Sequence, residues 1–364
     1  MRIVTVVGNR PQFIKAAAVS GPLREAHEEV LVHTGQHHDD ALSRVFFAEL
    51  GLARPERELG IAGGSNTSQT ARMLAALEPL LAAEAPDAVL VYGDTNSTLA
   101  GALSAAQARV PLIHVEAGMR SFDRSMPEEL NRVLTDHAAQ LLLCSSQTAA
   151  ENLRREAAAG EVEVVGDVMV DVALRWQPQA RERSEVVRGY GLEPGGFLLV
   201  TAHRAGNVDD PDRLAALVDL IAALPAPVLL PLHPRTAERL ERFGLAERLR
   251  GAPGVTLTEP LGYSEFTALL CQAQAVLTDS GGVQKEAYLA GVRCVTMRAS
   301  TEWVETVQTG WNTLVDLDAA AALAALEQPP PAEHPQLYGD GNAAARCVAA
   351  ISRLAALPAA GTAA

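Results

Sequence analysis

Apolar and polar residues follow one another along this chain in blocks, without a strict alternation. Short runs rich in Val, Ile and Leu are separated by longer Ala- and Leu-rich stretches, a pattern typical of βαβ units around parallel sheets. In the first half the predicted strands are 3–7, 29–33, 87–92, 111–115, 141–144 and 162–165. In the second half they are 197–201, 228–232, 255–257, 275–278, 292–297 and 312–315.

These two sets of strands predict an α/β protein with two doubly wound domains. A polar helical passage around 175–196 separates the sets, and the seam is expected near Gly166 and Asp167. We therefore predict an N-terminal domain over 1–166 and a C-terminal domain over 167–341, with a helix at about 342–357 that packs back on the first.

A closed (β/α)₈ barrel is the alternative fold. It requires eight evenly spaced units, and the long polar passages at 50–70 and 175–196 interrupt such a rhythm. The sequence favours two open sheets.

Composition narrows the classes of function. A chain of 364 residues with 48% apolar content exceeds what one core usually holds. The formal charge of −14 repels a phosphate backbone, so we expect no nucleic-acid or membrane partner and only a local positive site for any phosphate. The chain enters a strand at once and has no apolar run that could span a bilayer, so a cytoplasmic location is expected.

The four cysteines show no metal-ligand spacing, and three lie in apolar runs. We expect reduced, buried and inert thiols and no metal site. The residues are Cys144, Cys271, Cys294 and Cys347.

Candidate chemistry begins directly after the first strand. The segment from Gly8 to Lys15 combines a glycine turn, a proline near a helix start and the cations Arg10 and Lys15, which suits an anion. The spacing G-x-G-x-x-G is absent, which argues against a nicotinamide cofactor. An ordinary strand-to-helix turn with solvated charges is the alternative.

Carboxylates follow two further strands of the first half. Asp94 and Glu116 each come directly after an apolar run, and a third acid, Glu128 or Glu129, follows Pro127. Carboxylates at adjacent strand ends can face one ligand and exchange a proton with it. Alternatively, Asp94 caps the next helix, and Glu128 or Glu129 stabilises the dipole of the helix after Pro127; Glu116 has no such alternative.

The second half carries a complementary pattern for phosphate. The small residues Ser280, Gly281 and Gly282 open a helix after a strand, so backbone N–H groups can approach a diphosphate, and Glu286 further along can accept the hydroxyls of a ribose. His203 also follows a strand and can assist a leaving diphosphate. His233 sits before a proline, where a loop role is as plausible as a ligand contact.

In this order and at these separations, the segments resemble the non-hydrolysing UDP-N-acetylglucosamine 2-epimerases. The resemblance covers nearly the whole chain. It implies a fold of two facing Rossmann-like domains, as in glycosyltransferases of the B type, with the active site in the cleft between them. It also implies inversion at C2 without a cofactor, by elimination of UDP to a 2-acetamidoglucal and re-addition of UDP, and a homodimer. The segments that carry it are 8–15, 34–37, 93–95, 114–120, 127–132 and 278–286.

Particular residues of this chain match functional positions of that family. The match implies that Asp94, Glu116 and Glu128 are the catalytic acids and that His203 assists the departure of UDP. The implied contacts to the UDP-sugar are Arg10, Lys15, Leu261, Phe266, Ser280, Gly281, Gly282 and Glu286.

Some positions differ from the family's commonest pattern. Gln12 stands where many members have glutamate, and Trp303 where many have arginine. These variants resemble the branch with 2-epimerases of UDP-2,3-diacetamido-2,3-dideoxyglucuronic acid, which is the alternative substrate. His38 and Asp39 depart from the residues that hold a second, activating substrate molecule in some bacterial members, so we expect no such site.

Two other functions share parts of these motifs. A glycosyltransferase would use the same nucleotide cradle but would not need the three acids together. A non-catalytic nucleotide-sugar sensor would keep the segment 280–286 and tolerate loss of the acids.

Overall fold

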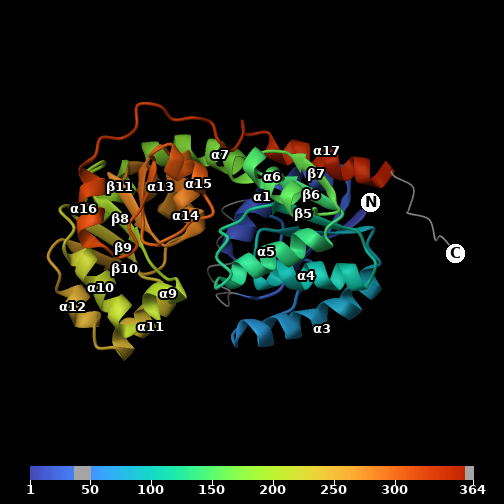
Figure 1. The fold of residues 1–364 in the computed structure, drawn as a ribbon, viewed down its shortest axis with the longest axis horizontal. Coiled ribbons are helices and arrows are strands. Elements are labelled where there is room, and N and C mark those ends of the chain that lie inside the picture. Colours follow the sequence, from blue (N-terminus) through green and yellow to red (C-terminus); the bar gives the residue numbers. More distant parts are fainter. Residues whose placement is uncertain (37–50, 357–364) are drawn as a thin grey trace. The chain divides into compact units, whose positions relative to one another are not determined.

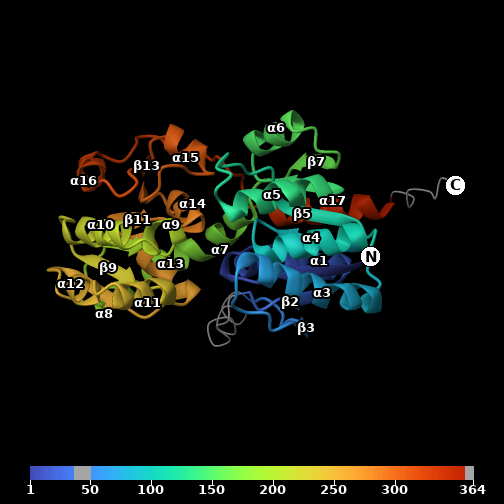
Figure 2. The same ribbon diagram turned by 60° about the horizontal axis from the view of Figure 1, so that its bottom comes forward.

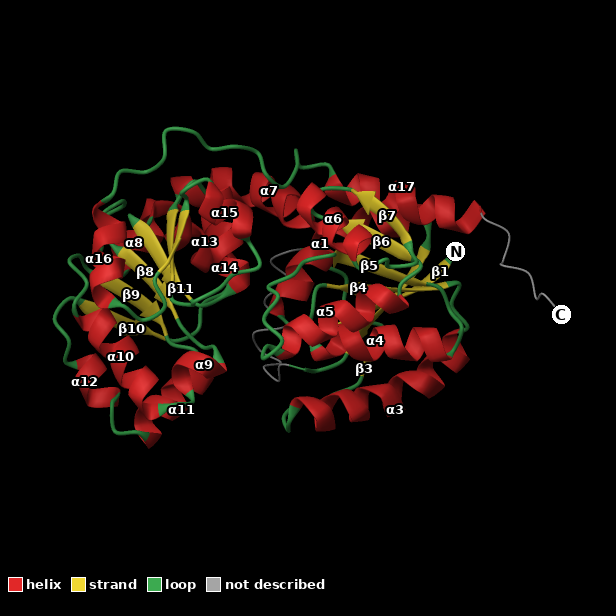
Figure 3. Ribbon diagram, in the orientation of Figure 1, coloured by secondary structure: helices red, strands yellow, loops and turns green. Residues whose placement is uncertain are grey.

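A computed structural model describes residues 1–36 and 51–356 of the chain. The chain divides into unit 1, which is Met1–Val172 with Gln336–Ala364, and unit 2, which is Ala173–Pro335. Each unit is built on one parallel sheet flanked by helices (Figure 1 and Figure 3). Because the strands form two open sheets, the barrel alternative is wrong and the prediction of two Rossmann-like sheets is confirmed.

The sheet of unit 1 has the order β3-β2-β1-β4-β5-β6-β7 among the described residues. The sequence predicts every strand except β3, which consists of two exposed residues in a polar passage and has no apolar run to reveal it. The strands are β1 (Arg2–Val7), β2 (Glu28–His33), β3 (Arg57–Glu58), β4 (Ala88–Tyr92), β5 (Leu112–Ala117), β6 (Leu141–Cys144) and β7 (Glu161–Val164).

Helices of unit 1 cover this sheet, and α3 lies along α4 (Figure 2). The last helix returns from the far end of the sequence to pack on α1 and β6. Its start is capped by Asp171, whose carboxylate accepts hydrogen bonds from the N–H groups of Ala343 (3.0 Å) and Ala344 (2.8 Å). The helices are α1 (Arg10–Ala26), α3 (Asn66–Glu84), α4 (Asn96–Gln107), α5 (Pro127–Ala138), α6 (Gln147–Arg155) and α17 (Ala343–Ala356), while α7 (Val168–Glu182) crosses the boundary between the units.

The sheet of unit 2 has the order β10-β9-β8-β11-β12-β13. Leu198 and Val200 of β8 pack into one apolar cluster, whereas Phe197 and Leu199 pack into another. Neighbouring residues of a strand point to opposite faces, so this sheet is buried on both sides, which is why its strands read as continuous apolar runs. The strands are β8 (Leu198–Thr201), β9 (Val228–Pro231), β10 (Val255–Thr258), β11 (Ala275–Thr278), β12 (Arg293–Thr296) and β13 (Asn312–Leu314).

The described helices that follow α7 in unit 2 include several single turns at strand ends. They are α8 (Ser184–Gly189), α9 (Ala205–Val208), α10 (Pro211–Ala222), α11 (Pro234–Arg242), α12 (Ala246–Arg250), α13 (Tyr263–Gln272), α14 (Gly281–Leu289), α15 (Val304–Gln308) and α16 (Ala319–Glu327).

Both sheets have a point where the direction of winding reverses. It lies between β1 and β4 in unit 1 and between β8 and β11 in unit 2. Ligands of open α/β sheets bind outside the carboxyl ends of the strands at such points, because the flanking loops diverge there. The loops after these four strands, and the loop after β5, are therefore where a site is expected.

Candidate functional site

The turn after β1 is tied to the end of β4 by one buried glutamine. Gln12 Oε1 accepts a hydrogen bond from the N–H of Gly8 at 2.7 Å. Its Nε2 donates to the carbonyl of Tyr92 and to the hydroxyl of Thr98, both at 2.9 Å. A carboxylate cannot donate hydrogen bonds, so these contacts explain why glutamine fits this position.

Lys15 of α1 and Glu116 of β5 form a buried ion pair through Nζ and Oε2, and each residue is 8% exposed. Both end beside Gly93, where an added Cβ would lie 3.0 Å from Nζ and 3.1 Å from Oε2. The structure thus brings two predicted site residues together. Lys15, expected to meet an anionic ligand, has a protein carboxylate as one partner.

Glu116 has an unusual backbone conformation. Its φ is +71°, and the register between β5 and β6 shifts between Val115 and Ala117. A bulge of this kind re-aims a side chain at a strand end. The left-handed conformation costs a non-glycine residue about 1–2 kcal/mol, and such strain clusters at functional sites.

Asp94 does not cap the helix that follows it. The N-cap of α4 is Thr95, which exchanges side-chain-to-backbone hydrogen bonds with Thr98 in a capping box. The carboxylate of Asp94 instead binds Arg132 of α5, whose Nε and Nη2 lie 3.0 and 2.8 Å from Oδ2. The capping alternative for Asp94 is therefore wrong.

The two glutamates at the start of α5 differ in their surroundings. Glu129 is 4% exposed and accepts hydrogen bonds from the N–H groups of Ser121 (2.9 Å) and Phe122 (3.0 Å) and from Arg132 Nη1 (2.6 Å). Glu128 is half-buried. Glu129 therefore organises the loop between β5 and α5, a role that the sequence did not separate from that of Glu128.

A buried network beneath this site was not assigned from the sequence. His114 of β5 contacts Asp136 through Nδ1 and the carbonyl of Gly93 through Nε2, each at 2.7 Å. Asp136 also accepts hydrogen bonds from the N–H of Gly118 (3.1 Å) and from Arg120 Nη1 (2.7 Å). Burial opposes ionisation of Asp136, but the nearby charges of His114 and Arg120 outweigh it and lower its pKa.

This network fixes the ends of β4 and β5 relative to each other. The one sequence signal for it was that His114 and Arg120 bracket Glu116 in a family-like segment. Asp136 lies in the last turn of the amphipathic helix α5, where a charged residue usually faces solvent. Its position therefore carried no signal.

In unit 2, the loop after β8 is held by a buried aspartate at the end of β11. The carboxylate of Asp279 accepts hydrogen bonds from the N–H groups of His203 (3.0 Å) and Arg204 (2.9 Å) and from Asn207 Nδ2 (3.2 Å). The ring of His203 stacks on His233, with centroids 4.9 Å apart and planes at 24°. The side chain of His203 is 35% exposed, so a ligand can reach it.

His233 supports the start of α11. It is the N-cap residue, and its Nδ1 accepts a hydrogen bond from the N–H of Arg235 at 3.1 Å. The other ring nitrogen of the neutral form then carries the proton. His233 therefore has a structural role in the loop before α11, as the residue that caps this helix.

The start of α14 matches the expected phosphate cradle in its local form. Ser280 is the N-cap and makes no side-chain cap bond. At Gly281 an added Cβ would collide with Glu302 Oε1, whereas at Gly282 it would meet nothing nearer than Ser280 Oγ at 3.9 Å. A side chain at Gly281 would have to displace the carboxylate of Glu302, and backbone N–H groups at a helix start suit a phosphate.

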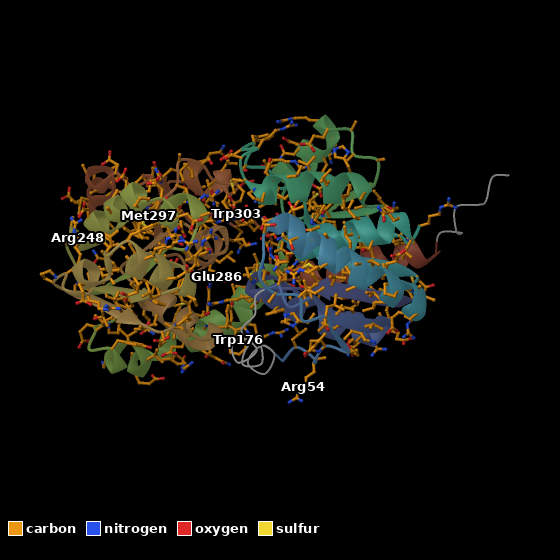
Figure 4. All side chains as sticks on the ribbon, turned by 90° about the horizontal axis from the view of Figure 1, so that it is seen from below. Arg54, Trp176, Arg248, Glu286, Met297 and Trp303 are labelled. Carbon is orange, nitrogen blue, oxygen red and sulfur yellow. The ribbon has the colours of Figure 1, made fainter. Side chains whose placement is uncertain are left out.

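Trp303 and Glu286 are labelled in unit 2 in Figure 4. The Nζ of Lys285, the residue before Glu286, lies 4.3 Å from the centroid of the Trp303 ring, and both Lys285 and Trp303 are buried. Trp303 therefore packs its ring against a buried cation. Glu286, the next residue of α14, is half-buried.

Three other expected ligand contacts differ in accessibility. Leu261 and Phe266 belong to the apolar core of unit 2, at 7% and 3% exposure. Arg10, the first residue of α1, is half-buried. His38 and Asp39 lie outside the described residues.

The four cysteines are free and buried. Burial raises the pKa of the Cys144 and Cys294 thiols to about 12 and that of Cys271 to about 11, so these thiols are not activated. Within residues 1–36 and 51–356, no group of three or more His, Cys, Asp or Glu residues could hold a metal ion. The same ranges contain no helix long and apolar enough to cross a membrane.

Two Rossmann-like units, with carboxylates at the strand ends of one and a glycine-rich helix start in the other, are the architecture of nucleotide-sugar enzymes with a glycosyltransferase-B-like fold. The family model described as UDP-N-acetylglucosamine 2-epimerase matches residues 23–352. The chain belongs to this family.

Curated relatives and solved structures agree with that membership. The chain is 44% identical to the UDP-2,3-diacetamido-2,3-dideoxy-D-glucuronate 2-epimerase of Pseudomonas aeruginosa, over 97% of this chain and 100% of the relative. It is 39% identical to the UDP-N-acetylglucosamine 2-epimerase of Methanocaldococcus jannaschii, over 90% and 92%. The crystal structure of the UDP-GlcNAc 2-epimerase from that organism, in complex with UDP-GlcNAc and UDP, matches with a TM-score of 0.91 at 37% identity, covering 97% of this chain and 100% of that one.

Proposed function

We propose that this protein is a non-hydrolysing UDP-N-acetylglucosamine 2-epimerase that interconverts UDP-GlcNAc and UDP-ManNAc. The observation that carries the proposal is the placement of Asp94 and Glu116 at the ends of adjacent strands, each paired with a cation. A nucleotide cradle alone would serve many enzymes, but paired carboxylates are what proton transfer at a sugar carbon requires.

The reaction needs two proton transfers and one leaving group. A carboxylate removes the C2 proton while the bond between C1 and the UDP oxygen breaks, which leaves a 2-acetamidoglucal and free UDP. UDP then adds back to C1, and C2 receives a proton on the opposite face. Two carboxyl groups in different protonation states are required, and we assign these steps to Asp94, Glu116 and Glu128 as a group.

The remaining assigned residues bind the nucleotide or stabilise its charge. His203 assists the departure of UDP, since it follows β8 at the winding reversal and its side chain is accessible. Ser280, Gly281 and Gly282 bind the diphosphate and Glu286 the ribose, with Leu261 and Phe266 near the base. Arg10 and Lys15 supply positive charge from unit 1. We assign no cofactor to the reaction.

A second candidate substrate is UDP-2,3-diacetamido-2,3-dideoxyglucuronate. Two observations favour it: the 44% identity to the Pseudomonas aeruginosa 2-epimerase of that sugar and the replacement of a common arginine by Trp303. The reaction at C2 would be the same. The two candidates differ only in the substituents at C3 and C6.

The test is incubation of the purified protein in deuterium oxide with each UDP-sugar separately, followed by proton NMR. We expect an epimer signal and deuterium at C2 for one of the two sugars. Recovery of both sugars without deuterium and without epimer would refute the proposal and favour a glycosyltransferase or a sensor. Light scattering during size-exclusion chromatography checks the homodimer that family membership suggests, and fractionation of the source cells checks a cytoplasmic location.

A further inference from the structure

Two consecutive residues of α5 bind Asp94, one at its backbone carbonyl and one at its carboxylate. Asn131 Nδ2 donates to the carbonyl of Asp94 at 3.0 Å. Arg132 Nε donates a hydrogen bond to Asp94 Oδ2 at 3.0 Å, and Arg132 Nη2 lies 2.8 Å from the same oxygen in the ion pair. The side chain of Asp94 remains 32% exposed. The carboxylate is thus held by one oxygen and can still meet a ligand with the other.

The side chain of Arg132 is buried and fixed by a second contact. It is 2% exposed, and it ranks among the largest fully buried side chains of the described chain. The remaining guanidinium nitrogen, Nη1, donates to Glu129 Oε2 at 2.6 Å. A guanidinium fixed between two carboxylates in this way is aligned by its planar fork, which lysine cannot reproduce.

Glu129 connects this arrangement to the loop that leaves β5. Its carboxylate accepts the N–H groups of Ser121 and Phe122 in addition to Arg132. Phe122 has a φ of +59° and is 71% exposed, so its own packing does not hold that conformation. Glu129 therefore fixes the loop and Arg132 together, and through Arg132 it fixes Asp94.

The charge around Asp94 comes from three elements. Arg132 and Glu129 lie on α5, Lys15 on α1 and Glu116 on β5, and the last two meet beside Gly93, the preceding residue. The Lys15 and Glu116 charges offset each other, whereas the single positive charge of Arg132 lies between the carboxylates of Asp94 and Glu129. Among the residues that the structure describes, Arg132 is the cation that contacts the Asp94 carboxylate.

We propose that Arg132 is a positioning residue for the epimerase reaction, which aligns the Asp94 carboxylate, and that Glu129 anchors Arg132. The inference rests on the proposed function and deepens it. Arg132 acts through Asp94 and does not need to touch the substrate, so its loss impairs the chemical step rather than nucleotide binding.

The experiment compares Arg132→Met, Arg132→Lys and Arg24→Met with the wild-type chain. Arg24 is the matched control, because it also binds a buried carboxylate of unit 1, Glu29 at 2.8 Å, but at the start of β2, the opposite end of the sheet. Measurements are kcat and KM for C2 epimerisation by NMR, the Kd for UDP by calorimetry, and thermal stability.

We expect Arg132→Met to lower kcat by about 10²–10³-fold, the usual cost of one preorganised electrostatic contact, with KM and the Kd for UDP changed by less than about threefold. Arg132→Lys keeps a cation without the fork and should lose less kcat than Arg132→Met. Arg24→Met should be less stable but keep the wild-type kcat per folded molecule.

Each other outcome counts against the inference. An Arg132→Met protein with wild-type kcat overturns it, as does a loss that appears only in KM or in the Kd for UDP, or an equal loss of kcat in Arg24→Met. If Arg132→Met does not fold, Arg132→Lys decides: a wild-type kcat in that variant overturns the alignment role. A wild-type chain that exchanges no C2 deuterium overturns the proposed function itself, which distinguishes the two failures.

Discussion

Gly93 is the position where a single methyl group tests the geometry of the carboxylate site. It directly follows β4 (Ala88–Tyr92), has a φ of +61°, and lies directly before Asp94. In a Gly93→Ala variant the new Cβ would lie 3.0 Å from Lys15 Nζ and 3.1 Å from Glu116 Oε2. The substitution therefore strains the backbone and displaces the buried ion pair at once.

The two effects have separate magnitudes. The left-handed conformation costs alanine about 1–2 kcal/mol, which for a unit of this size lowers the melting temperature by about 2–8 °C. Non-bonded heavy atoms normally stay about 3.5 Å or more apart. The side chains of Lys15 and Glu116 must therefore each move away from the new Cβ by a few tenths of an ångström. A displacement of about 1 Å can cost 10²-fold in rate, so a smaller one should lower kcat by about tenfold.

Gly60→Ala separates these effects. Gly60 is also in unit 1 and has a φ of +63°, but an added Cβ there meets nothing within 4 Å. Both variants should show a similar fall in melting temperature by calorimetry, and only Gly93→Ala should lose activity in the NMR epimerisation assay. Equal activities in the two variants would refute the claim that the ion pair beside Gly93 belongs to the catalytic site.

Two further predictions concern the supporting network and the leaving group. Asp136→Asn should cost about 3–5 kcal/mol of unfolding free energy at pH 7, because it leaves Arg120 and His114 without their buried anion. Since the folded pKa of Asp136 is lowered, its contribution is present above the unfolded pKa of about 3.9 and fades as pH falls through the folded value. Urea unfolding of both proteins from pH 7 to 3 checks this, and a difference that grows toward low pH would contradict it. His203→Ala should lower kcat more than it raises KM, because the proposed role is on charge at the leaving oxygen; steady-state kinetics that show only a rise in KM would argue against that role.

Much of the fold could be predicted from local pattern alone. Strands buried on both faces, such as β8 and β11, appear as uninterrupted apolar runs, and Ala- and Leu-rich stretches separate them. The strand β3 was missed because Arg57 and Glu58 are exposed edge residues without an apolar pattern. The boundary between the units inside α7 has no local signature either, because a continuous helix crosses it.

The candidate site could be located but not fully interpreted from sequence. Asp94 and Thr95 are both good capping residues, and only the structure shows that Thr95 caps α4 while Asp94 binds Arg132. Glu128 and Glu129 are neighbours of the same type, and burial alone distinguishes the one that holds the loop. The type of a residue at a strand end predicts that its side chain lies near a ligand. It does not predict with which other side chain a charged residue forms an ion pair.

The sequence by itself determined the α/β class, the two sets of parallel strands and the strand ends where the acids lie. These features depend on residues that are neighbours in the chain: apolar runs mark strands buried on both faces, and turn residues mark where the strands end. Tertiary structure decided which charges meet. Lys15 and Glu116, or Asp94 and Arg132, are far apart in sequence and pair because the winding reversal brings β1 beside β4 and the sheet order places β5 next to it. Long-range pairing depends on the register of whole elements, and no local pattern records it.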